Sequence, residues 1–268
     1  MLKSKAMQAI QGMKSRRARP GRWLPALSAL IALAGWEGVA RASGLPQFIL
    51  PPPSAVAARL SRALLDGSLL GHTLVTLTEV LAGLALGVSL ASLLGYALAK
   101  SSALERILSP YVVASQAIPI IAIAPLLVIW FGPGRISKIL ICGLIVFFPV
   151  LVNTVVGVRS VPRELYELMR SLRATRSQVF LKLEAPAAMP VLLGGLKIGA
   201  TLSVIGAVVG EFVGADQGLG FLINLGDGLY DTPLVFVAVL TLIAMALTLF
   251  GLVDALERRL LAWRTVEG

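Results

Sequence analysis

The sequence is poor in charged residues, cysteine and histidine. Only 14% of its 268 residues are charged, whereas 57% are hydrophobic; soluble domains carry roughly a quarter charged residues. So little polar surface cannot cover a water-soluble domain of this length, and the expected solvent is a lipid bilayer. Cys142 is the only cysteine and His72 the only histidine. This excludes an internal disulfide and leaves too few ligands for a zinc site.

Long uncharged stretches are what the sequence has in place of polar surface. Because a helix rises about 1.5 Å per residue, about 20 apolar residues cross a hydrocarbon layer of about 30 Å. Five stretches meet this length, and a shorter sixth, the first in the chain, carries Glu37. We expect transmembrane helices over residues 23–40, 80–99, 107–130, 139–158, 186–210 and 232–253. Only helices satisfy every backbone group internally, so the predicted class is an all-α membrane protein with six transmembrane helices.

Basic residues indicate the orientation, because lysine and arginine are retained on the cytoplasmic side. With both termini inside, 18 of the 24 lysines and arginines lie in cytoplasmic segments. The remaining six are Arg41, Arg59, Arg62, Arg135 and Lys138 in outer segments and Lys197 within a span. The sequence therefore predicts that both termini are cytoplasmic. A cleaved signal sequence over the first hydrophobic block is the alternative.

The spans divide the chain into an expected order of segments. These are a basic cytoplasmic segment (1–22), the first helix (23–40), an extracytoplasmic elbow (41–71), a five-helix core (72–264) that includes a cytoplasmic segment (159–190), and a tail (265–268). In the elbow, the prolines at 51–53 cannot continue a helix. Ser54 is suited to cap a short surface helix over residues 55–65.

Glycine and proline mark special places within the spans. The pairs Gly83/Gly87, Gly195/Gly199 and Gly206/Gly210 predict close helix packing. In the third span, Pro119 and Pro125 remove backbone hydrogen bonds, so we expect a broken helix at mid-depth. Such a break is tolerated where protein or water satisfies the freed carbonyls, which favours a pathway lining. A kinked packing helix is the alternative.

Few ionisable groups lie within or beside the spans, and each needs a partner, a cavity or an interfacial depth. We expect Glu37 and Glu79 to reach the headgroup region and Lys197 to extend inward along its aliphatic stem. Glu211 ends the fifth span and is followed by a glycine-rich segment up to Gly220. This pattern is typical of a tight re-entrant turn, and we interpret it as an extracytoplasmic gate, with an ordinary loop as the alternative.

The cytoplasmic segment 159–190 has the pattern of two short helices. Leu165, Leu168, Met169 and Leu172 form an apolar stripe at helical spacing. Thr175 then begins a capping box with Gln178 three residues later. Helices this short need support, so the stripe is expected to contact either a protein partner or the bilayer surface.

From about residue 50 to residue 264, the chain resembles the permease subunit of bacterial binding-protein-dependent ABC importers of the nitrate, sulfonate and taurine type. The resemblance lies in Leu-Pro-Pro-Pro-Ser at 50–54, Ile-Trp-Phe-Gly at 129–132, Phe-Pro at 148–149 with Asn-Thr at 153–154, Gly-Val-Arg at 157–159, Gly-Glu-Phe-Val-Gly at 210–214, Gly-Leu-Gly at 218–220 and Leu-Glu-Arg-Arg at 256–259 with Trp-Arg at 263–264. The sequence Ser-Leu-Arg-Ala at 171–174 is similar to the branch associated with heterocyclic vitamin precursors, such as thiamine pyrimidines or riboflavin.

The family's cytoplasmic EAA signature corresponds to Glu167-Leu168-Met169, Arg173-Ala174 and Pro186. The two alanines of the signature are replaced by Leu168 and Met169, and its glycine by Arg173. Since arginine does not adopt a left-handed conformation cheaply, we expect the bend between the two short helices to be made in another way.

The resemblance implies a transport subunit that is not itself an enzyme. No Gly-x-x-x-x-Gly-Lys-Ser/Thr motif occurs in the chain, so ATP and Mg²⁺ are expected on separate cytoplasmic ATPase subunits, with no cofactor or metal in this chain. The other implied partners are a second copy of the permease, as a homodimer, and a periplasmic or lipid-anchored binding protein. The implied location is the bacterial inner membrane.

The resemblance also assigns candidate site residues in three places. Coupling to the ATPase would use Glu164, Leu165, Glu167, Leu168, Met169, Leu172, Arg173, Ala174 and Pro186. The pathway, lined from the third and fifth spans, would include Ser115, Gln116, Pro119 and Asn153, and the extracytoplasmic gate Glu211, Asp216, Gly218 and Gly220.

Three other classes of function are weighed against this one. An ion-coupled secondary transporter is the main alternative, but it would usually need acids at mid-membrane and often inverted repeats, and we find neither. An intramembrane hydrolase needs a nucleophile and a base, and His72 has no evident serine or aspartate companion. A nucleic-acid partner is not expected, because the basic residues lie beside apolar blocks.

Overall fold

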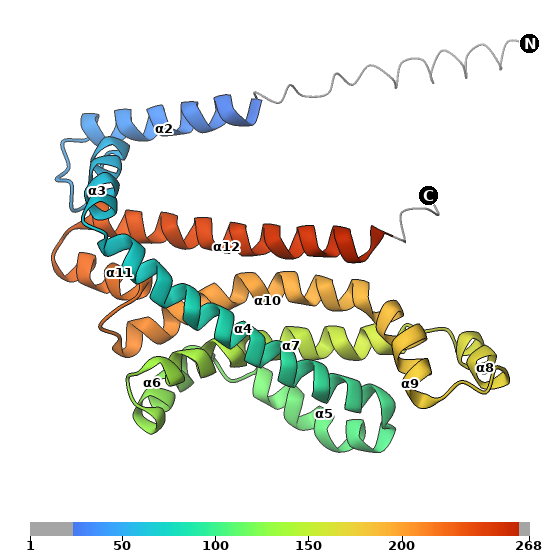
Figure 1. Ribbon diagram of the computed structural model, residues 1–268. Helices are drawn as coiled ribbons and strands as arrows, with labels where there is room; N and C mark the ends of the chain where they lie inside the picture. The colour runs from blue at the N-terminus through green and yellow to red at the C-terminus, as the bar shows by residue number, and fades with distance from the viewer. Residues whose placement is uncertain (1–23, 263–268) are drawn as a thin grey trace, which may run out of the picture.

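The computed structural model describes residues 24–262, whose regular structure is entirely helical (Figure 1). The predicted all-α class is confirmed over this range, while the predicted segments 1–22 and 265–268 lie outside the described residues. The helices are α2 (Leu24–Ala42), α3 (Pro53–Leu65), α4 (Ser68–Lys100), α5 (Ser102–Gln116), α6 (Ile120–Phe131), α7 (Arg135–Arg159), α8 (Arg163–Ser171), α9 (Arg176–Val179), the π-helical turn η1 (Phe180–Glu184), α10 (Ala185–Gly214), α11 (Leu219–Gly228) and α12 (Thr232–Leu260).

Helix α7 is central to the bundle. It packs along α4 and along α10, and α12 packs on α10 and α11 (Figure 1). Glycines permit this close approach: a Cβ atom at Gly87 would lie 2.6 Å from the carbonyl oxygen of Gly143, and one at Gly206 would lie 2.8 Å from the Cα atom of Cys142. The predicted packing role is confirmed at these two glycines, because any side chain there would collide with the backbone of α7.

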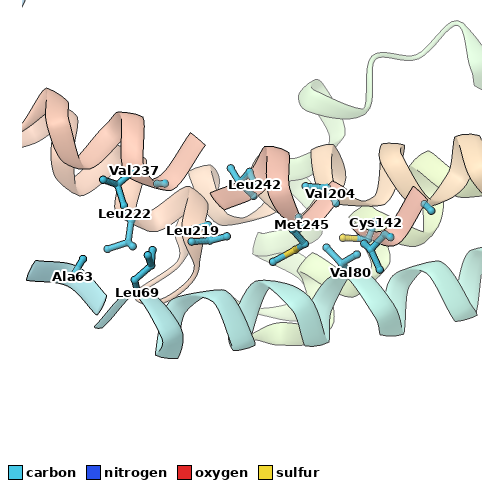
Figure 2. Packing of buried hydrophobic residues seen from close by; sticks show 14 of the residues in the cluster. Ala63, Leu69, Val80, Cys142, Val204, Leu219, Leu222, Val237, Leu242 and Met245 are labelled. Carbon is cyan, nitrogen blue, oxygen red and sulfur yellow. The ribbon is translucent and has the colours of Figure 1, made fainter. Parts of the chain in front are cut away.

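The largest group of buried apolar side chains joins α4, α7, α10, α11 and α12 (Figure 2). Val80, Cys142, Val204 and Met245 meet in its middle, where four helices come together. Leu69 and Leu222 extend the group toward α3 and α11, at one end of the molecule. The group therefore fixes the glycine-rich turn before α11 to the ends of α4 and α10.

Four helical runs are long and apolar enough to cross a membrane: α4, α7, the run from α9 through α10, and α12. The pair α5 and α6 would make a fifth, but it is bent by 96°. The predicted single span over residues 107–130 is thus two helices, as the expectation of a broken helix requires. Helix α2 covers the predicted first span without meeting the same criterion among the described residues. The number of six transmembrane helices therefore remains a prediction.

Helix α3 begins at Pro53, so the prediction that Ser54 caps this helix is wrong. Proline suits the first helical position because it has no N–H group to leave unpaired. Ser54 instead donates two hydrogen bonds to the Glu37 carboxylate, from its backbone nitrogen (3.0 Å) and its hydroxyl (2.8 Å). Glu37 thereby links α2 to α3.

One prediction about the ionisable groups is wrong. Glu79 does not reach the headgroup region, because it is only 1% exposed and lies beside Glu211. The inward extension of Lys197 stays a prediction; the structure adds that its ammonium group pairs with Asp254 at 2.6 Å and with Glu257, both on α12. The sequence carries no local sign of either neighbouring helix.

Candidate functional site

The predicted coupling segment lies at the end of the molecule opposite α11 and includes α8 and α9 (Figure 1). Helix α8 and its C-cap residue place Leu165, Leu168 and Leu172 on the surface, with exposed fractions of 40%, 53% and 68%. Met169 is half-buried, and Glu164 and Glu167 are exposed. Two exposed leucines on the helix and one at its C-cap form an apolar face that another surface can cover, and the helix has no fully buried residue.

The bend after α8 is made by Arg173 in a left-handed conformation, with φ of 51°. The backbone nitrogen of Ala174 donates to the carbonyl of Met169 at 2.9 Å, and that of Arg173 donates to the carbonyl of Arg170 at 3.0 Å. These bonds close the helix end in the manner that a glycine usually allows. Our prediction that the bend is made in another way is therefore wrong: the chain keeps the glycine geometry and tolerates its strain.

Helix α9 begins with the predicted capping box, which is confirmed. The Gln178 backbone nitrogen donates to the Thr175 hydroxyl at 3.3 Å, and the Thr175 backbone nitrogen donates to the Gln178 side chain at 2.8 Å. The chain then passes through η1 into α10, where Pro186 occupies the first turn. Single π-helical turns are often found at functional sites, and this one places Glu184 on a buried face.

Glu184 is the centre of a polar cluster at this end of the bundle. Its carboxylate accepts a hydrogen bond of 2.8 Å from the Tyr96 hydroxyl and forms an ion pair with Lys100, both on α4. The ring of Tyr166, on α8, lies 5.2 Å from the Lys100 ammonium group. Burial, followed by the charge of Glu184, raises the pKa of Tyr166 to about 12.

Two predicted pathway residues, Gln116 and Asn153, meet at one cavity. It has a volume of about 400 Å³ and is also lined by Phe148, Pro149 and Val152. The cavity therefore lies between α5 and α7, which correspond to the third and fourth predicted spans. We expected the fifth span to contribute to the lining, but none of the lining residues comes from it. The amide nitrogen of the Asn153 side chain donates a hydrogen bond of 2.7 Å to the Pro149 carbonyl.

The other two predicted pathway residues lie apart from that cavity. Ser115 lines a neighbouring apolar cavity of about 420 Å³, which shares Phe148 with the first. Pro119 precedes the first residue of α6, at the break between α5 and α6, and lines neither of these two cavities. Its place in the structure is the bend, where its fixed backbone angle favours the start of a new helix.

The predicted gate residues Glu211, Gly218 and Gly220 come together at the α11 end of the bundle. The Glu211 side chain is 1% exposed and accepts hydrogen bonds from the Thr76 hydroxyl (2.6 Å) and from the Gly220 backbone nitrogen. Gly218 has φ of 116°, and a Cβ atom on it would collide with the Glu211 carboxylate. The glycines are thus needed for the turn to approach the acid. Asp216 is exposed and outside this cluster.

Sequence reasoning missed three groups that complete these sites: Glu184, Thr76 and His72. Glu184 stands at the start of a long apolar run, and that isolated acid was the available signal. Thr76 and His72 are one helical turn apart on α4, and they bind the turn before α11: Leu219 donates to Thr76 at 2.8 Å and Gly218 donates to the His72 ring at 3.0 Å. Their partners are some 140 positions away, which no local pattern reveals.

Comparisons with known proteins show the family to which the chain is similar. Residues 83–262 match the family described as binding-protein-dependent transport system inner membrane component. The chain is 49% identical over 244 residues to the riboflavin transport system permease protein RibX of Chloroflexus aurantiacus, covering 91% of each chain. It is 38% identical over 240 residues to the formylaminopyrimidine transport permease protein ThiX of Halalkalibacterium halodurans, covering 90% of this chain and 95% of that one.

More distant similarities extend the comparison. The chain is 34% identical over 240 residues to the taurine transport system permease protein TauC of Escherichia coli, covering 87% of this chain and 86% of that one. A crystal structure of an amino acid ABC transporter with histidines superposes with a TM-score of 0.59 at 20% identity, covering 75% of this chain and 97% of that chain. At that identity the likeness shows the fold.

Proposed function

The chain belongs to the family of binding-protein-dependent transport system inner membrane components, and from this premise we propose that it forms the translocation pathway for a small heterocyclic solute. Its general role is that of an ABC importer permease, a transport component of the membrane. The solute class, the partners and the location of the pathway are the proposed parts. The relative named for riboflavin transport is the observation that carries the choice of solute, because it shares 49% of the aligned residues over 91% of both chains.

The cavity between α5 and α7 supports a flat, polar solute. Phe148 offers an aromatic face, and Gln116 and Asn153 offer amide groups at the same cavity. Aromatic faces stack on heterocyclic rings, and amides can both donate and accept hydrogen bonds at the ring edges. A sulfonate or nitrate would instead favour a cationic lining, and none of the five lining residues is basic.

The energy source in this proposal is a separate pair of ATPase subunits at the α8 end. The exposed face of Leu165, Leu168 and Leu172 would insert into the ATPase, with Glu164 and Glu167 exposed beside it. Met169, Arg173, Ala174 and Pro186 would hold the shape of the segment. ATP and Mg²⁺ would bind to that subunit, because the present sequence has no phosphate-binding loop. Hydrolysis there would shift the permease between inward-open and outward-open states.

The remaining partners follow from the two ends of the bundle. The α8 end would face the cytoplasm, as would both termini, and the α11 end would face a periplasmic or lipid-anchored binding protein. Glu211, Gly218 and Gly220 would shape the gate at that outer end, with the exposed Asp216 available to the binding protein. A second copy of this permease, as a homodimer, would complete the pathway in the bacterial inner membrane.

Reconstitution tests this function. The permease, its ATPase and its binding protein are placed together in vesicles, and uptake of radiolabelled riboflavin, formylaminopyrimidine and taurine is compared with and without ATP. We expect ATP-dependent uptake of one of the two heterocycles and no uptake of taurine. Uptake of taurine alone would refute the solute class. Gradient-driven uptake by the permease alone would instead favour an ion-coupled secondary transporter.

A further inference from the structure

Glu184 is a buried carboxylate held by partners from two other helices. Only 1% of its surface is exposed, and it is the last residue of η1, directly before α10. Tyr96 and Lys100, one helical turn apart on α4, supply a hydrogen bond of 2.8 Å and an ion pair. A buried charge is costly without such partners, so the start of α10 is held firmly against the inner end of α4.

Helix α8 reaches this cluster through Tyr166. The Lys100 ammonium group lies 5.2 Å from the centre of the Tyr166 ring, and the same ammonium group pairs with the Glu184 carboxylate. The contact with Lys100 is a cation–π interaction, which strengthens when the groups are shielded from water. Tyr166 therefore contacts Lys100 directly and is linked to Glu184 through it.

Other connections between α8 and the membrane helices are sparse. Among the hydrogen bonds, ion pairs and ring contacts of residues 24–262, Tyr166 is the only α8 side chain that reaches another helix. The α8 leucines face outward. Besides the covalent chain at either end of α8 and the packing of the half-buried Met169, Tyr166 is therefore the side chain through which a force on that outer face would reach the bundle.

The neighbouring side chains connect the cluster further. The Phe180 ring of η1 contacts the Tyr96 ring edge to face, with centroids 5.3 Å apart. A cavity of about 370 Å³ lies directly beside Tyr96, Phe180 and Glu184, between α4, α7 and α10. Because this cavity leaves space on one side of the cluster, the tied residues can move together without displacing close-packed atoms there.

We propose that Tyr166, Glu184 and Lys100 form a mechanical joint that transmits movement of α8 to α4 and α10. Tyr166 connects α8 to the joint, Glu184 connects α10, and Lys100 with Tyr96 connects α4. The three residues are positioning residues: they touch neither nucleotide nor solute. This inference rests on the proposed function, since it requires an ATPase to move α8.

The test uses the full complex of permease, ATPase and binding protein in vesicles, with uptake and ATP hydrolysis measured in the same sample. The variants are Tyr166→Leu, which removes the ring beside Lys100, and Glu184→Gln, which removes the charge that Lys100 pairs with. We expect either variant to assemble and to hydrolyse ATP within about twofold of the unaltered complex while uptake per ATP falls about tenfold, as loss of one shielded cation–π contact or one buried ion pair would give.

A matched control is available at the same end of the bundle. Glu105 and Arg159 also form an ion pair, which links α5 to α7 without touching α8. Glu105→Gln should leave uptake per ATP unchanged. Lys100→Arg, which keeps the charge, should also retain coupling.

Two results would overturn the joint. One is an unchanged ratio of uptake to hydrolysis in both Tyr166→Leu and Glu184→Gln. The other is loss of the ATPase from the purified complex in both variants, which would show that the cluster only shapes the docking segment. Failure of the unaltered complex to import any solute would refute the proposed function instead, so the two failures are distinguishable.

Discussion

The Thr76 hydroxyl donates a hydrogen bond of 2.6 Å to the Glu211 carboxylate, although the two residues are 135 positions apart. The same hydroxyl accepts a hydrogen bond from the Leu219 backbone at 2.8 Å, and Glu211 accepts another from Gly220. One threonine on α4 and one acid on α10 thus fix the beginning of α11. The turn between α10 and α11, for which we predict a gating role, is therefore held by the bundle itself.

Replacing Glu211 by alanine should destabilise the protein. The variant leaves the Gly220 N–H without its buried acceptor and leaves the Thr76 hydroxyl with only the His72 carbonyl, at 3.2 Å. A buried donor left without an acceptor costs about 1–3 kcal/mol. We expect a lower midpoint of thermal unfolding in detergent. Asp216→Ala is the control, because this acid is exposed on the same turn and its removal should leave the midpoint unchanged. Equal midpoints for both variants would contradict the assignment.

Sequence patterns predicted the parts of this fold that depend on neighbouring residues. The apolar runs, the capping box at Thr175 and the break near Pro119 are local, because helix periodicity and proline sterics act over a few positions. The buried neighbour of Glu79 and the ion-pair partners of Lys197 come from other helices, and sequence alone does not say which helices meet. The prediction that Ser54 caps α3 was wrong because Pro53, which is favoured at the first helical position, begins the helix one residue earlier.

The same division applies to the candidate sites. The exposed stripe of α8 was predicted because it repeats at helical spacing, and the meeting of Gln116 with Asn153 was expected only from the resemblance to a family. Glu184 was missed because its partners Tyr96 and Lys100 lie 84 or more positions earlier. At Arg173 the stereochemical argument failed, because the hydrogen bonds of the helix end outweigh the cost of the left-handed backbone.

Replacing Gly206 by alanine should weaken helix packing. A Cβ atom there would lie 2.8 Å from the Cα atom of Cys142, so α10 would have to move away from α7. Overpacking of this kind costs about 1–3 kcal/mol, measured as a loss of thermal stability in detergent. The control is Gly251→Ala on α12, where no atom lies within 4 Å of the added carbon. If Gly206→Ala lost no more thermal stability than the Gly251→Ala control, α10 would be shown to accommodate the added carbon without strain.

Replacing Arg173 by glycine should stabilise the segment after α8. Arg173 has φ of 51°, and an L-residue in this region lowers the stability of the folded protein by about 1 kcal/mol relative to glycine. We expect slower proteolysis of residues 170–178 in the purified protein, without loss of ATPase binding. Arg170→Gly is the comparison, because it places glycine inside α8, where it should accelerate proteolysis. Faster cleavage of the Arg173 variant would mean that the arginine side chain stabilises the bend.

Replacing Asn153 by leucine tests the pathway cavity. The change keeps a similar volume but removes the amide, so a heterocycle would lose about one hydrogen bond, which corresponds to about tenfold weaker uptake. Initial rates of ATP-dependent uptake by the reconstituted complex measure this effect. Val152→Ala alters an apolar residue of the same cavity and should leave the rate within about twofold. Unchanged uptake in the Asn153 variant would place the pathway elsewhere.

The double substitution Glu167→Ala with Leu172→Asp tests docking of the ATPase on α8. Leu172 is 68% exposed and Glu167 is also exposed, so neither change should disturb the bundle or its membrane insertion. An aspartate in the apolar face would have to be desolvated on docking, which costs several kcal/mol, so we expect the ATPase to be lost on purification and uptake to be abolished. Asp227→Ala with Leu229→Asp makes the same exchange at the opposite end, where Leu229 is 65% exposed, and should retain the ATPase. Undiminished solute-stimulated ATP hydrolysis in the first variant would show that the ATPase docks on another surface.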